Sequence, residues 1–377
     1  MTQLAVTVVL LLHDDPPNIE KTLRSVEAQV RPGLSVSVLV VDDGTSPRAR
    51  HLVSQWTTVD TIDVPAGTSI AQAKNLALHA VATDLVLLLD DHMWLLDASD
   101  LAAACREISN DESIAGICGY YRTPHRSDWN VLRDIKRHSI YGKGGSRREI
   151  SRKEFTPFST GIALVAKSRG WTPDFPEDVF PRGFGGEDIP ALMTGIEAGL
   201  RFVYTPALAA HHLHELSFAD LARKLEVEVR GRFSILYWMT SPAGIRVPYV
   251  HGFMNGPVIL YISVALAAVG RSGQRRRRWA VVGALSAVEA GLSLQCLNAD
   301  GRYDYAKRLQ ASLYVLLSDL LTPVVALQYA VSSWRRPYSR IGLLQFLSMW
   351  KHMMHWDLEK YSSLLGRLTR SGGRTHG

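Results

Sequence analysis

Residues 85–92 read LVLLLDDH, and this stretch decides the fold. The apolar run 85–89 is short and uninterrupted, which is typical of a strand buried on both faces in a parallel sheet. Asp90, Asp91 and His92 follow at the carboxyl end of that strand, where open α/β sheets bind their ligands. Two carboxylates and an imidazole suit a divalent cation. The alternative is a solvated turn that caps a helix.

Further strands and helices alternate upstream of this stretch. Residues 4–12 and 36–41 are apolar and rich in β-branched side chains, so each predicts another buried strand. Residues 19–26 carry apolar side chains at helical spacing, and residues 70–82 predict a second helix. This alternation predicts an α/β fold with a mostly parallel sheet flanked by helices.

The chain divides into two parts of different character. With 377 residues it is long enough for two domains, and we expect a catalytic domain at 1–240 and a helical region at 241–377. The second part holds 17 Lys+Arg and 6 Asp+Glu, a net charge of +11, whereas the first holds 25 and 30, a net charge of −5. Such an asymmetry suggests different partners for the two parts.

The second part contains three apolar stretches near 20 residues, a length that can span a bilayer. They cover 249–270, 279–297 and 311–331, and an arginine-rich run, 271–278, separates the first two. A cytoplasmic first domain would leave those arginines outside, against the positive-inside tendency. We therefore expect membrane association rather than full spanning, with arginines on anionic headgroups. The alternative is a soluble helical region that serves as a homodimer interface.

The cysteines add one constraint. Cys105, Cys118 and Cys296 are odd in number and widely spaced, without a CxxC pair. This pattern favours a reducing compartment and argues against disulfides and against a thiolate zinc site. The amino terminus lacks a basic n-region, so we expect a first strand there and not a signal peptide.

Polar clusters follow the predicted strands and helices of the first part in a definite order. Each has a plain structural explanation, such as turn chemistry or a helix start. Together they run as Asp42-Asp43-Gly44-Thr45, Lys74-Asn75, Asp90-Asp91-His92, Phe184-Gly185-Gly186-Glu187-Asp188 and His211-His212-Leu213-His214.

This order, over roughly residues 4–240, resembles the family 2 glycosyltransferases, which are inverting sugar-nucleotide enzymes with a GT-A fold. The resemblance implies that Asp42 contacts the base or ribose with Asp43 nearby, and that Lys74 and Asn75 approach the nucleotide. Lys74 stands where the family commonly has Arg. The first strand also departs from the family: Leu11, His13 and Asp14 stand where Pro and Tyr-Asn are usual.

By the same resemblance, LVLLLDDH occupies the DxD position. Asp90 would bind a metal, with His92 or Asp91 as the second ligand and Asp91 otherwise part of the nucleotide site. A metal is chemically reasonable because the pyrophosphate must leave as an anion, which Mg²⁺ or Mn²⁺ neutralises. An imidazole ligand favours Mn²⁺. His212 and His214 share one face of a predicted strand and either could complete the shell; the alternative is a surface histidine cluster.

On the acceptor side, the resemblance places Asp188 as the catalytic base, with Glu187 binding acceptor hydroxyls. One carboxylate within hydrogen-bond reach suffices to take the proton of an attacking hydroxyl. A single displacement would invert the anomeric configuration.

The sequence thus predicts a metal-dependent hexosyltransferase. We expect a UDP-sugar donor, with GDP or dTDP as alternatives, and a lipid-linked or cell-envelope glycan acceptor at the cytoplasmic face of the membrane. The alternatives are a soluble small-molecule acceptor or a non-catalytic scaffold that binds nucleotide sugars. Nucleic acid is not expected as a partner, because the first part is acidic and lacks interleaved aromatic residues.

Overall fold

The structure is a computed structural model of the whole chain. It describes residues 3–13, 16, 18–44, 47–56, 58–122, 146–151, 159–177 and 186–213, together with scattered helical positions between 226 and 335. The chain forms two compact units, Met1–Pro248 and Tyr249–Gly377. The predicted domain boundary at 240/241 lies outside the described residues.

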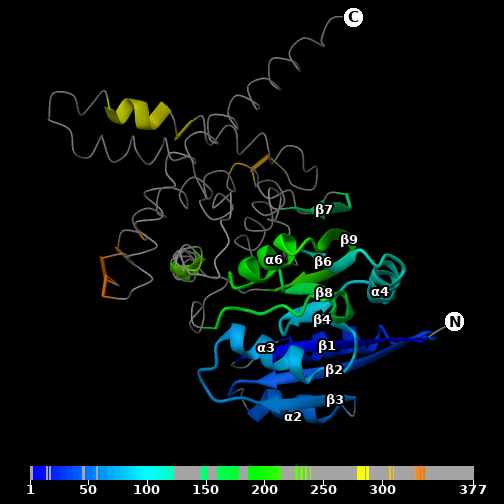
Figure 1. Cartoon of the computed structure of the whole chain (residues 1–377). Coiled ribbons are helices and arrows are strands. Elements are labelled where there is room, and N and C mark those ends of the chain that lie inside the picture. The colour runs from blue at the N-terminus through cyan, green and yellow to red at the C-terminus, as the bar shows by residue number, and fades with distance from the viewer. Residues whose placement is uncertain are drawn as a thin grey trace, which may run out of the picture. The chain divides into compact units, whose positions relative to one another are not determined.

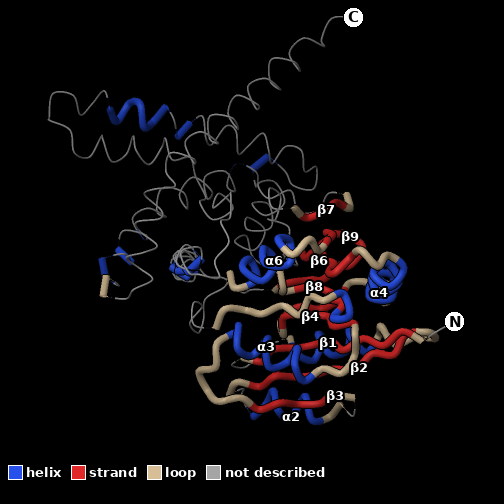
Figure 2. The backbone as a smooth tube through the Cα atoms, in the orientation of Figure 1, coloured by secondary structure: helices blue, strands red, loops and turns tan. Residues whose placement is uncertain are grey.

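The first unit is built on one nine-stranded mixed sheet (Figures 1 and 2). Its order is β3-β2-β1-β4-β8-β6-β9-β5, and β7 pairs with β9. Strands β1 to β4, β6 and β9 run in one direction, whereas β5, β7 and β8 run in the other. The strands are β1 Leu4–Leu12, β2 Leu34–Asp42, β3 Val59–Asp63, β4 Leu85–Asp90, β5 Met93–Leu95, β6 Ile114–Arg122, β7 Arg148–Ile150, β8 Ile162–Ala166 and β9 Arg201–His212.

Helices pack against this sheet. Among those described, α3 contacts β1 and β2, α4 contacts β6, β8 and β9, and α6 contacts β9. The amphipathic pattern of α1 is confirmed, because Ile19, Leu23 and Val26 are buried. The helices are α1 Ile19–Glu27, α2 Pro47–Ser54, α3 Ile70–Ala80, α4 Asp100–Asn110 and α6 Asp188–Glu197, with a 3₁₀ turn, η1, at Lys167–Arg169. The α/β fold predicted from the sequence is therefore confirmed.

The register of the central strands creates a polar edge. In β4 the run 85–89 is completely buried, as its apolar sequence predicts. Burial of each such leucine contributes about 1.5–3 kcal/mol. Strand β1 lies between β2 and β4, with Leu12 opposite Asp42 and Leu11 opposite Asp90. The carboxyl ends of three parallel strands therefore bring both acidic motifs to one edge of the sheet.

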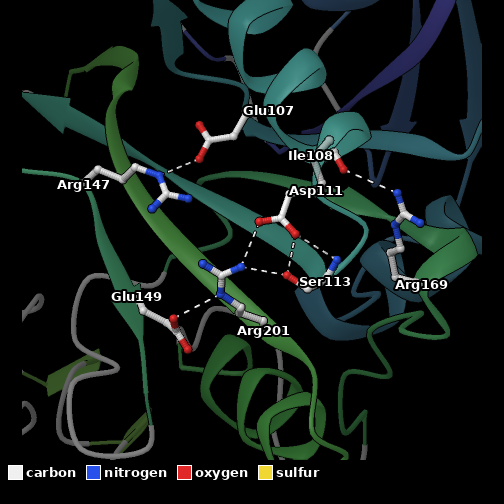
Figure 3. Close-up of polar contacts among 8 residues, drawn as sticks. All are labelled: Glu107, Ile108, Asp111, Ser113, Arg147, Glu149, Arg169 and Arg201. Carbon is white, nitrogen blue, oxygen red and sulfur yellow. Dashed lines mark hydrogen bonds and ion pairs between the residues drawn. The ribbon is translucent and has the colours of Figure 1, made fainter.

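Ion pairs anchor the short strand β7 to its neighbours (Figure 3). The Arg201 guanidinium of β9 contacts Asp111, after α4, at 2.9 Å and Glu149 of β7 at 3.1 Å. Arg147 donates from Nε to Glu107 of α4 at 2.7 Å. Exposed pairs of this kind contribute little stability singly. The Arg201–Glu149 pair is the one among them that links β9 directly to β7.

The second unit contributes only scattered helical positions to the described residues. Within these, none of the helices combines the length and the apolar character that a bilayer span requires. The three apolar stretches predicted from the sequence lie mostly outside the described residues, so membrane association stays a prediction.

Candidate active site

A cavity of about 420 Å³ opens at the polar edge of the sheet, where β1, β2 and β4 end and α3 and α6 begin. Most of the site residues predicted from the sequence converge on it, although they come from segments far apart in the chain. The predicted residues that line it are Asp43, Lys74, Asp90, Asp91, His92, Glu187, Asp188 and His212.

Three of these residues form a cluster able to hold a metal ion. Asp90, His92 and His212 each offer a ligand atom, and these atoms lie within 4.8 Å of one another. The two imidazoles face each other, with 2.8 Å between their Nε2 atoms. Two nitrogen lone pairs at this distance repel unless a proton or a cation lies between them. The donor set of one carboxylate and two imidazoles therefore fits a divalent transition metal.

Asp91 orients His92 within this cluster. Its Oδ1 atom lies 2.7 Å from His92 Nδ1, and its Oδ2 accepts the backbone N–H of His13 at 3.2 Å. An ionised carboxylate can only accept, so Nδ1 carries the proton and Nε2 keeps its lone pair for a ligand. Carboxylate partners of this kind accompany metal-binding histidines in general. The geometry thus favours His92 over Asp91 as the second ligand.

Asp90 is held against the backbone of the next strand. Its N–H donates to Gly161 O at 3.0 Å. A Cβ atom at position 161 would lie 2.7 Å from Asp90 Oδ2 and 2.8 Å from the Met93 methyl group. Glycine is therefore needed at this position for Asp90 to keep its place.

Asp188 faces the same cavity from the start of α6. The Thr160 N–H donates to Asp188 Oδ2 at 3.4 Å. The preceding residue, Glu187, is buried, and its Oε1 lies 2.5 Å from Lys74 Nζ. Lys74 Nζ also donates to Thr160 Oγ1 at 2.6 Å.

The charge of Lys74 is set by its surroundings. Burial alone lowers the pKa of its ammonium, but the carboxylates of Glu187, Asp188 and Asp90 outweigh burial, and the net pKa is raised. Lys74 is therefore a permanent cation among three acidic groups. The resemblance implied that Lys74 approaches the nucleotide and that Glu187 binds acceptor hydroxyls; here the two side chains bind each other.

Residues 7–165 match the family model described as glycosyl transferase family 2. The matched part lies in the first unit, Met1–Pro248. The protein is a glycosyltransferase with a GT-A fold, as the order of its motifs predicted. Among curated proteins, none matches the sequence.

Solved structures resemble this glycosyltransferase in fold. The mannosyltransferase PcManGT from Pyrobaculum calidifontis, solved with GDP-Man and Mn²⁺, is 19% identical with a TM-score of 0.52, covering 84% of this chain and 86% of its own. TarS 1–349 from S. aureus is 14% identical with a TM-score of 0.47, covering 84% and 91%. Glucosyl-3-phosphoglycerate synthase from Mycobacterium tuberculosis, solved with Mn²⁺ and UDP-Glc, is 14% identical with a TM-score of 0.44, covering 64% and 80%.

Two predicted site residues of the glycosyltransferase, Asp42 and Asn75, are described and do not line the cavity. Asp42 is buried, with Oδ2 on Arg50 Nε at 2.6 Å and Oδ1 on the N–H of Gly44 at 3.0 Å. The Asn75 side-chain Nδ2 donates to Phe175 O and to Glu177 Oε1, each at 2.9 Å. Its Oδ1 accepts the backbone N–H of Phe175 at 2.9 Å. His214 lies outside the described residues. Their assignment to the nucleotide and metal sites stays a prediction.

Sequence reasoning missed several residues that the glycosyltransferase brings to this cavity. His13, noted only as a departure from the family pattern, has its Nδ1 2.9 Å from Asp43 Oδ2. Thr160 and Gly161 were not singled out at all, although both contact acidic site residues. The Ser-Thr-Gly turn before the apolar run 162–166 was the signal that could have drawn attention to them.

Proposed function

We propose that the protein transfers a sugar, with inversion, from a nucleotide-sugar donor to a hydroxyl group of an acceptor, and that a divalent metal is required. The observation that carries this proposal is the pairing of two groups in one cavity. A metal-ligand cluster, Asp90, His92 and His212, and a carboxylate at a helix start, Asp188, both line it. These are the two functions that a single displacement at an anomeric carbon needs.

Asp90, His92 and His212 would hold the metal, and imidazole ligands favour Mn²⁺ over Mg²⁺. When bound, such an ion supplies the positive charge that stabilises a departing pyrophosphate. Asp91 keeps the Nε2 lone pair of His92 directed at the cluster. The presence of GDP-Man and Mn²⁺ in the similar mannosyltransferase structure supports a nucleotide-sugar donor and this metal.

Asp188 would accept the proton of the attacking acceptor hydroxyl. It is held by the N–H of Thr160 at 3.4 Å, and Gly186, two residues earlier in the chain, adopts φ +111°, a conformation open to glycine. Lys74, buried beside Glu187, lies among the acids of the site. These contacts keep the carboxylate in place before the acceptor arrives.

A base substitution tests this assignment. Asp188→Asn keeps the shape of the side chain but cannot take a proton, so transfer should fall by about 10²- to 10⁴-fold. Donor affinity, measured by calorimetry with Mn²⁺ present, should stay nearly unchanged. Asp60→Asn, on an exposed position of β3, is the matched control and should keep full activity. An equal loss of donor binding in Asp188→Asn would show that Asp188 is not the base.

The nucleotide and the acceptor belong to the same proposal. The family resemblance favours UDP, whereas the similar mannosyltransferase was solved with GDP-Man, so a panel of UDP, GDP and dTDP sugars should be compared. We propose a lipid-linked or cell-envelope acceptor reached from the cytoplasmic face of the membrane. The +11 charge of 241–377 supports this, as do the exposed Trp279 and Trp334.

A further inference from the structure

The segment 159–161 lines the cavity together with both functional groups of the site. It leads into β8, which pairs antiparallel with β4, with Ile162 opposite Leu89. Gly161 therefore lies beside Asp90, accepts its N–H and leaves room for its carboxylate. On this side, the segment contacts the metal-binding end of the cavity.

The residue before Gly161, Thr160, contacts the proposed base. It is buried, and its N–H points to Asp188 Oδ2 at 3.4 Å. Its hydroxyl oxygen accepts from Lys74 Nζ at 2.6 Å. Two consecutive residues, Thr160 and Gly161, thus contact the two carboxylates that the proposed reaction uses.

Lys74 links Thr160 to the start of α6. Its ammonium donates both to Thr160 Oγ1 and to Glu187 Oε1, so it binds Thr160 and the chain neighbour of Asp188 at once. All three side chains are buried, which limits the alternative positions that they can adopt. A cation with two short contacts restrains the side chains of Thr160 and Glu187, of which the first contacts Asp188 and the second precedes it in the chain.

We infer that Thr160 is a positioning residue. Its side chain is held by Lys74, and its backbone N–H sets the position of the base Asp188. Because Gly161 follows directly and contacts Asp90, Thr160 also fixes Asp188 relative to Asp90. The inference rests on the proposed function. Thr160 needs no contact with donor or acceptor for this role, because it acts through Asp188. A displacement of a reacting group by about 1 Å can cost about 100-fold in rate.

The test compares Thr160→Val, which removes the hydroxyl and keeps the shape, with Thr160→Ser, which keeps the hydroxyl. The valine variant should lower kcat for transfer by about 10- to 100-fold, with the donor Kd in Mn²⁺ within about twofold of wild type. The serine variant should recover most of kcat. In an Asp188→Asn background, Thr160→Val should cause no further loss, since its effect passes through the base. If the valine variant does not fold, Thr160→Ala removes the same hydroxyl.

Two outcomes would overturn the inference while leaving the proposed function standing. One is a loss of donor affinity in Thr160→Val that matches the loss of kcat, which would mean a donor contact. The other is a loss in the Asp188→Asn background as large as in wild type, which would mean independent action. Failure of the wild type to bind or transfer any nucleotide sugar would overturn the proposed function, and the inference with it.

Discussion

Adjacent acids in the LVLLLDDH stretch have different partners. Asp90 faces the cavity beside His212, whereas Asp91 is turned onto His92 Nδ1 and the backbone of His13. Asp90 is the last residue of β4, whereas Asp91 is the first residue of the turn that follows it. The two acids therefore have separate roles: Asp90 can bind a metal, and Asp91 orients the second ligand, His92.

Gly161→Ala tests the close approach beside Asp90. The added Cβ would lie 2.7 Å from Asp90 Oδ2, so the carboxylate must move. We expect the Mn²⁺ affinity to fall by about 10- to 100-fold, the range seen when the support of a metal ligand is lost. Titration calorimetry with Mn²⁺ measures this. Gly283→Ala, where a Cβ meets open space, is the control and should bind Mn²⁺ normally; unchanged affinity in the alanine variant at 161 would argue against Asp90 as a ligand.

At the scale of the elements, the Lys74–Glu187 pair joins α3 to the start of α6 across 113 positions of sequence. Both side chains are buried, so removing one partner leaves the other charge without compensation. The pair therefore makes the docking of α6 dependent on α3.

Lys74→Met should lower the free energy of unfolding by about 3–5 kcal/mol, because Glu187 is left buried and unpaired. Adding Glu187→Gln should restore part of the loss. The pKa of Lys74 is raised above its ordinary 10.5, so its stabilisation is complete below that pH and is lost only as the pH rises through the raised folded-state value. Urea unfolding at about pH 7 and about pH 9 should give the same penalty. A penalty that disappears by pH 9, or no penalty at all, would contradict the buried pair.

The elements also show what the sequence could predict. Apolar runs followed by acids located β2, β4 and the polar edge, because parallel strands end together. The antiparallel β8 between β4 and β6 was not expected, since periodicity does not give strand order. The Lys74–Glu187 pair, the Asn75 contact with Phe175 and the role of Thr160 depend on tertiary packing over about 90 to 110 residues of sequence, which no local pattern encodes.

At the scale of the whole molecule, the chain combines an acidic catalytic unit with a basic second one. We therefore expect anionic surfaces to attract the second unit. The family match covers residues 7–165 and does not include the C-terminal region. The proposed membrane role belongs to that region.

Membrane fractionation tests that role. The full chain should sediment with membranes at low salt and be released at about 1 M salt, where the Debye length is about 3 Å. Replacing the four arginines 275–278 by glutamine should weaken the association without changing the catalytic unit. A protein that stays in the supernatant at low salt would contradict the membrane acceptor, and one that needs detergent for release would mean insertion.

The central claim is that one cavity binds a nucleotide sugar through a metal held by Asp90, His92 and His212. The most direct measurement is the thermal shift of the full chain with a panel of nucleotide sugars, with Mn²⁺ and with a chelator, alongside His212→Ala. A ligand at about 100 times its Kd stabilises by about 2.7 kcal/mol, which such a shift detects readily. We predict stabilisation by at least one nucleotide sugar only when Mn²⁺ is present, and its loss in His212→Ala. Stabilisation that is equal in chelator, or that survives in His212→Ala, would contradict the claim.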